Sequence, residues 1–100
     1  MNPRAMFFQA LYEAPYLEAS PTELYFLKSG GSQNITLTCN VNWSVQSKPT
    51  WVSLDKSSGT GSQTISVTCS ANSGVEREWN IVISGEGKSV SIYVWQAPNA

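Results

Sequence analysis

The feature that most constrains the fold of this chain is an alternation of apolar and polar residues that recurs in short runs. In the clearest runs, apolar residues occupy every second position and most of the residues between them are Ser, Thr or Asn; the apolar members are Ile35, Leu37, Cys39 and Val41, then Ile65, Val67, Cys69 and Ala71, then Val90, Ile92 and Val94. A period of two places every second side chain on one face of a β-strand. Each run therefore predicts a strand with one buried face.

Turn-forming segments separate these runs. Lys28–Ser32 ends an earlier alternation at Leu24 and Phe26. Lys56–Ser62 is expected to be a flexible loop, and Ser84–Lys88 is expected to be a tight hairpin connection. No stretch after Pro21 has a helical period of useful length. About seven short strands with turn signals every 8–12 residues are typical of a sandwich. The sequence thus predicts an all-β, immunoglobulin-like β-sandwich of about seven strands.

The first residues differ from the rest of the chain. One hundred residues are enough for one small domain, which we assign to 17–100. Residues 1–16 carry large apolar side chains at spacings that fit one or two helical turns. A solvated tail lacks such groups, so we expect a short N-terminal arm that docks onto a partner chain. Its predicted partner-binding residues are Met6, Phe7, Phe8, Leu11 and Tyr12.

Charge excludes two classes of partner. The formal net charge is −1 and the chain has only six Lys and Arg residues, which are scattered. Nucleic acids and anionic membranes require clustered basic groups, so we expect neither as a partner. No segment reaches the length of a transmembrane helix, and the first residues do not resemble a secretory signal. We therefore expect the chain to remain in the compartment where it is made, unless a signal has been removed.

The sequence offers little for catalysis. It contains no His and a single aspartate, Asp55, and no pair of carboxylates has a spacing suited to glycoside hydrolysis. We predict no catalytic residue, no metal site and no cofactor. Glu76 and Glu78, which flank Arg77, are interpreted as a solvated charge cluster.

The chain has two cysteines, Cys39 and Cys69, and the alternation places both in the core. A disulfide would require that their strands face or adjoin each other. Without evidence of export we favour two buried free thiols that pack as small apolar groups.

The aromatic residues divide by strand face. Trp79 shares the parity of Ile81 and Ile83 and is expected in the core, as is Trp43; Trp51 is ambiguous. Tyr93 and Trp95 have the parity opposite to Ile92 and Val94 and should lie on the outer face, where Tyr25 extends the patch if the first strand is nearby. Either a sugar or a protein partner contacts these rings, or residues 1–16 fold back and cover them.

Residues 17–96 resemble the BACON domain, an immunoglobulin-like module. The matching features occur in the family's order: Ser20-Pro21, Leu24, Phe26, Gly30-Gly31-Ser32, Asn40, Trp43, Trp51, Ser58-Gly59-Thr60-Gly61, Ile65-Ser66-Val67, Ala71-Asn72, Arg77, Trp79, Ile81, Ile83 and Val94-Trp95-Gln96. The family name proposes carbohydrate binding. Such modules occur in secreted glycan-processing proteins of gut bacteria and in virion proteins of crAss-like phages.

Two functions follow from this resemblance and from the apolar arm. The first is a non-enzymatic structural protein, an auxiliary capsid protein of a phage, which assembles in the host cytoplasm and docks into the virion through its arm. The alternative is a carbohydrate-binding module, extracellular or at a cell surface, that uses Tyr25, Tyr93 and Trp95. The expected partners are capsid-type neighbours in the first case and glycans in the second.

Overall fold

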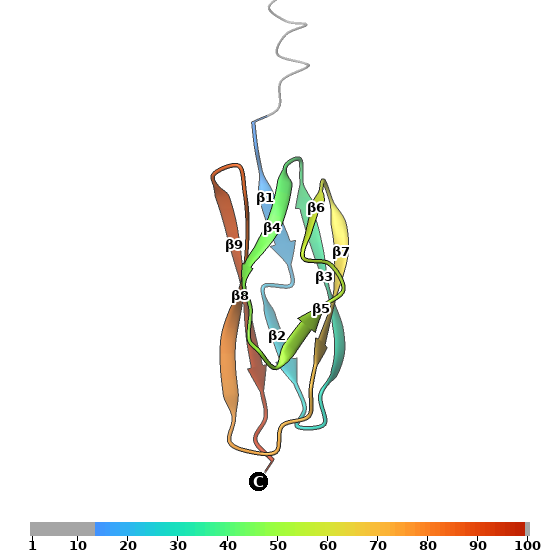
Figure 1. Cartoon of the computed structure of the whole chain (residues 1–100), viewed down its shortest axis with the longest axis vertical. Coiled ribbons are helices and arrows are strands. Elements are labelled where there is room, and N and C mark those ends of the chain that lie inside the picture. The colour runs from blue at the N-terminus through green and yellow to red at the C-terminus, as the bar shows by residue number, and fades with distance from the viewer. Residues whose placement is uncertain (1–13, 100) are drawn as a thin grey trace, which may run out of the picture.

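A computed structural model describes residues 14–99, which form nine β-strands and no helix (Figure 1). The strands make two sheets packed face to face, a four-stranded sheet in the order β1-β3-β7-β5 and a five-stranded sheet in the order β2-β9-β8-β4-β6. Their bounds are β1 (Leu17–Ser20), β2 (Glu23–Phe26), β3 (Gly31–Cys39), β4 (Asn42–Ser47), β5 (Val52–Leu54), β6 (Ser58–Thr60), β7 (Gln63–Cys69), β8 (Arg77–Gly85) and β9 (Lys88–Gln96). The predicted immunoglobulin-like β-sandwich is confirmed.

The core forms from the inward-facing members of the alternating runs. The residues that are fully buried between the sheets are Ile35, Leu37, Ile65, Val67, Ile81, Ile83, Ile92 and Val94. Trp43 also belongs to the core as predicted, because it is only 3% exposed, and its Nε1 donates to the Gly61 carbonyl at 3.1 Å. That bond satisfies the one polar group of the buried indole.

A two-residue turn joins β8 to β9, as the hairpin prediction required. Gly85 pairs with Lys88, and the intervening Glu86 and Gly87 have φ of 48° and 81°. Two successive positive φ values are the geometry of a type I′ turn, whose twist matches that of the flanking strands.

The chain changes sheets between β1 and β2, at a cis Ser20–Pro21 peptide bond. β1 pairs antiparallel with β3, whereas β2 pairs parallel with β9 in the opposite sheet. The parallel register sets Glu23 opposite Tyr93 and Tyr25 opposite Trp95. An N-terminal strand is thereby placed beside the last strand of the domain.

Asn40 ties residues 14–16 to the sandwich. Its Oδ1 accepts from the Tyr16 amide at 2.9 Å, and its Nδ2 donates to the Ala14 carbonyl at 3.0 Å. The backbone amide of Asn40 donates in turn to the Tyr16 carbonyl at 3.4 Å. The last residues of the predicted arm thus join the domain, while Met6, Phe7, Phe8, Leu11 and Tyr12 lie outside the described residues.

The segment Lys56–Ser62 contains a strand, contrary to the prediction of a flexible loop. β6 pairs with β4, and Gly59 lies opposite Trp43. A Cβ at position 59 would lie 2.7 Å from the Trp43 ring. Gly59 was expected to make this segment flexible. It instead leaves room for the Trp43 indole beside a paired strand.

The core assignment of Trp79 is wrong, because this side chain is 61% exposed. Trp79 has the inward parity and pairs with the buried Val94 on β9. On its other side, however, β4 pairs with β8 only from Ser84 to Val82, through a register shift between Val45 and Ser47. Trp79 lies beyond the last of these pairs, so no strand of residues 14–99 flanks it on that side.

The two cysteines are buried free thiols, as favoured from the sequence. Cys69 pairs with Gly31, at the opposite end of β3 from Cys39. Eight residues at a rise of about 3.3 Å separate those ends by roughly 26 Å, far beyond the reach of a disulfide. Burial raises the pKa of the Cys69 thiol, against the opposing effect of the nearby Arg77 charge.

Candidate functional site

Tyr25, Tyr93 and Trp95 gather on the outer face of β2 and β9, and we call this group the aromatic face. The parallel register brings β2 alongside β9, so that the ring centroid of Tyr25 lies 6.2 Å from that of Tyr93 and 6.3 Å from that of Trp95. The rings are inclined by 64° and 55°, in edge-on and tilted arrangements. Tyr25 is 55% exposed, and the other two are partly buried beside it.

Each ring is held at its polar edge by a glutamate. The Tyr25 hydroxyl donates to Glu23 Oε1 at 2.8 Å, and the Tyr93 hydroxyl donates to Glu78 Oε2. Trp95 Nε1 donates to Glu76 Oε2 at 2.7 Å. The bond to Glu78, with a smaller contribution from desolvation, raises the pKa of Tyr93 to about 12, and the bond to Glu23 raises the pKa of Tyr25.

The expected solvated charge cluster at 76–78 divides between two faces of the sheet. Glu76 and Glu78 reach the aromatic face, whereas Arg77 has the opposite parity and turns toward the interior. The Arg77 guanidinium carbon lies 4.6 Å from the centre of the Trp51 ring, and its Nε donates to Gln96 Oε1 at 2.8 Å. Among residues 14–99, no arginine therefore lies beside the carboxylates of the aromatic face.

The glutamates were the part of the site that sequence reasoning missed. Glu78 and Trp95 are directly opposite each other in the β8–β9 ladder, and Glu23 is opposite Tyr93. The period-two pattern could have placed Glu78 on the outer face with Tyr93 and Trp95 once β8 and β9 were read as one hairpin. Glu76 precedes β8, so no strand parity applied to it.

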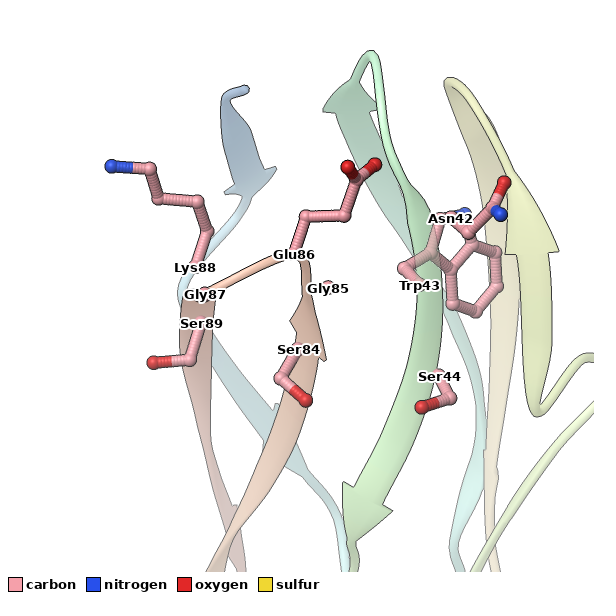
Figure 2. A pocket seen from close by; sticks show the side chains of 9 residues that line it. All are labelled: Asn42, Trp43, Ser44, Ser84, Gly85, Glu86, Gly87, Lys88 and Ser89. Carbon is pink, nitrogen blue, oxygen red and sulfur yellow. The ribbon is translucent and has the colours of Figure 1, made fainter. Parts of the chain in front are cut away.

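A separate groove of about 570 Å³ lies between the start of β4 and the β8–β9 turn (Figure 2). Ser44 and Ser84 point toward one another across it, whereas Lys88 points away (Figure 2). Its lining is small and polar, and the single aromatic residue there, Trp43, is buried. We therefore place the candidate site on the aromatic face, where Tyr25 is exposed beside two partly buried rings, and not in this groove.

The described residues 14–99 contain no group of three or more His, Cys, Asp or Glu side chains that could hold a metal ion. Asp55 has a structural role, since its Oδ1 accepts from the Ser66 amide at 2.7 Å. The hydrogen bond from the Ser66 amide has the largest effect on the pKa of Asp55 and lowers it, and the hydrogen bond from Lys56 lowers it further. In the same part of the chain no helix is long and apolar enough to cross a membrane.

The fold and the aromatic face are those of an immunoglobulin-like binding domain. The chain belongs to the BACON family, whose model, described as "Putative binding domain, N-terminal", matches residues 41–97. The predicted resemblance is thereby confirmed. A comparison with curated proteins finds no significant match.

Several solved structures have a similar fold. A GH5 xyloglucanase from Bacteroides ovatus, solved in complex with a XXXG heptasaccharide, is 25% identical over 85% of this chain, with a TM-score of 0.78. This chain spans only 19% of that enzyme. Domains 4 and 5 of the S-layer protein SbsC give 23% identity and a TM-score of 0.56, covering 84% of this chain and 54% of theirs. WR4, a C. elegans MSP family member, is 12% identical with a TM-score of 0.57. The match covers 82% of this chain and 96% of WR4.

Proposed function

We propose that this chain is a non-catalytic binding module that holds a neutral glycan on the aromatic face. The observation that carries the proposal is that the exposed Tyr25 ring and the partly buried Tyr93 and Trp95 rings lie together, each hydrogen-bonded to a carboxylate. A sugar ring presents C–H groups that pack on an aromatic face and hydroxyls that donate to carboxylate oxygens. The likeness to part of a xyloglucanase solved with a heptasaccharide supports carbohydrate as the ligand class.

The charge of the face favours a neutral ligand. Glu23, Glu76 and Glu78 all border the rings, while Arg77 lies on the other side of the sheet. A sulfated or uronic acid chain would bring its own negative charges against these carboxylates. The domain would accordingly act outside the cell or at a cell surface, where neutral polysaccharides are found.

Tyr25 is the most exposed ring of the face, so its replacement tests the proposal. We expect Tyr25→Ala to weaken binding of a neutral oligosaccharide by about tenfold, because a stacked ring contributes on the order of 1.4 kcal/mol. Tyr25→Phe keeps the ring and loses only the bond to Glu23, so it should retain most of the affinity. Amide chemical shifts of β2 and β9 during titration at millimolar glycan provide the measurement.

Trp79→Ala is the matched control, because Trp79 is exposed but lies outside the aromatic face. It should leave the affinity for a short oligosaccharide unchanged. The proposal fails if neutral oligosaccharides shift no resonance of β2 or β9, or if Tyr25→Ala and Trp79→Ala reduce affinity equally.

A second candidate function is docking onto a larger protein assembly, of which an auxiliary capsid protein is the most concrete form. The hydrogen bonds between Asn40 and Ala14 and Tyr16 anchor the last residues of the predicted arm to the sandwich. Met6, Phe7, Phe8, Leu11 and Tyr12 would then contact a neighbouring chain, in a virion assembled in the host cytoplasm. The matches described above give no support to a capsid role, so this proposal rests on the arm alone.

Deleting residues 1–13 tests whether the arm serves a partner. All residues of the buried core lie within 17–96. The free energy of unfolding of the truncated chain should therefore differ from that of the full chain by no more than about 0.5 kcal/mol. Chemical denaturation followed by tryptophan fluorescence measures the difference. A loss of several kcal/mol would assign the arm to the fold of its own domain and remove the second candidate.

A further inference from the structure

Within the part of the chain that the structure describes, the first half of β8 is a sheet edge with no neighbouring strand. β9 pairs with the whole of β8, from Arg77 to Gly85, but β4 leaves it after Val82. In Figure 1 this part of β8 lies on the outline of the molecule, and β4 turns away toward β5. Glu78, Trp79 and Asn80 are all exposed.

The backbone groups at this edge point outward. The Tyr93 amide donates to the Thr22 carbonyl, toward β2, so Tyr93 and its partner Asn80 form a non-hydrogen-bonded pair of the β8–β9 ladder. Glu78 has the same parity as Asn80. Both residues therefore direct their N–H and C=O away from β9, and within residues 14–99 no backbone partner is found for them on that side.

We propose that a second copy of this chain pairs with the edge, β8 against β8, in an antiparallel register centred on Trp79. A twofold axis through Trp79 sets Glu78 opposite Asn80 of the second copy, and Asn80 opposite its Glu78. These are the residues whose backbone groups point outward, so each such pair exchanges both of its hydrogen bonds.

The side chains in this register are self-complementary. Glu78 meets the Asn80 amide of the second copy and not another carboxylate, so no like charges face each other. Trp79 falls opposite its own copy at a non-hydrogen-bonded pair, where the two strands approach most closely, at about 4.5 Å between Cα atoms. Aromatic pairs at such positions are among the stabilising cross-strand contacts, and this one covers an indole that is 61% exposed.

The dimer would join two five-stranded sheets into one continuous sheet. The aromatic faces of the two copies would then lie on the same side, because the outer side chains of β8 alternate in phase across the new pair. The dimer does not depend on the proposed glycan binding. A short edge buries little surface, so the association is weak and visible only at high protein concentration.

Sedimentation equilibrium of the full-length chain tests the proposal, using Asn80→Pro as the disrupting variant. Proline removes the outward N–H at position 80, and a proline is tolerated where the N–H of an edge strand faces solvent. The wild-type chain should dimerise as its concentration rises. Asn80→Pro should raise the dissociation constant of the dimer by about tenfold or more, because it removes an edge hydrogen bond and introduces a steric clash. Asn80→Ser, which keeps the N–H, is the matched control and should still dimerise.

Cysteine cross-linking tests the register without loss of Trp79. Opposite Cα atoms of a hydrogen-bonded pair lie about 5.5 Å apart, within disulfide range. A mixture of Glu78→Cys and Asn80→Cys chains should therefore form the mixed disulfide, while each variant alone cross-links poorly. The native Cys39 and Cys69 are buried and do not compete.

Three results would overturn the proposal. The first is a wild-type chain that remains monomeric at all concentrations; the second is an Asn80→Pro chain that is folded by circular dichroism and dimerises as strongly as wild type. The third is protection of the Glu78 and Asn80 amides only by an added extended peptide, which would identify a foreign strand as the occupant. Cross-links confined to identical positions would reject the register.

Discussion

Replacing Gln96 by alanine is expected to lower the free energy of unfolding by about 3 kcal/mol, because it removes three hydrogen bonds and leaves a void at a fully buried position. Gln96 is 0% exposed at the end of β9. Its Nε2 donates to the Leu27 carbonyl at 3.1 Å and to the Ser70 carbonyl at 2.7 Å, and its Oε1 accepts from Arg77. One amide thus joins β9, the end of β2 and the end of β7.

Gln46→Ala is the matched control for this loss. Gln46 is exposed on β4, and its Nε2 donates only to the Ser44 hydroxyl at 2.9 Å. Its replacement should change the free energy of unfolding by less than about 0.5 kcal/mol. Urea denaturation of both variants gives the comparison, and similar losses at positions 46 and 96 would reject the view that the amide network holds this end of the sandwich.

Replacing Gly30 by alanine is expected to cost about 3 kcal/mol or more, from a backbone penalty and a steric clash together. Gly30 has φ of 80°, in the left-handed region that disfavours a side chain. A Cβ there would also collide with the backbone carbonyl of Cys69. This glycine lets the turn between β2 and β3 approach the end of β7.

Gly61→Ala separates the two effects. Gly61 has φ of 75°, and a Cβ there would meet nothing within 4 Å. Its alanine variant should pay the backbone penalty alone, about 1–2 kcal/mol. The difference between the two variants, measured by the same denaturation, isolates the clash at Gly30. Equal losses would mean that the turn moves away from β7 at little cost.

The alternating runs predicted the strands that bury one face completely. Ile35, Ile65 and Ile92 follow a period of two within long strands, so their burial could be read from the sequence. The strands β1 and β6 could not be predicted in this way, because runs of four and three residues are too short to establish a period. Their pairing depends on neighbours that are distant in the sequence, such as Trp43 beside Gly59.

The candidate site was predictable where parity alone decides it. Tyr93 and Trp95 lie outward because Ile92 and Val94 lie inward, and the parallel pairing of β2 with β9 adds Tyr25. Trp79 shows the limit of parity, since a residue facing inward is covered only if a strand also lies beside it. Gln96 shares the inward parity of Val94, but its burial follows from the carbonyls it reaches, and these belong to other elements.

The parallel pairing of β2 with β9 also determines how the domain bears a mechanical load. β1 begins at one end of the sandwich and the chain ends after β9 at the other (Figure 1), and β2 and β9 run in the same direction. Once β1 has separated from β3, tension applied through these two ends pulls β2 and β9 past each other along their length. Their hydrogen bonds are then loaded together and not peeled apart in turn, so this short ladder would resist extension until all of its bonds yield at once.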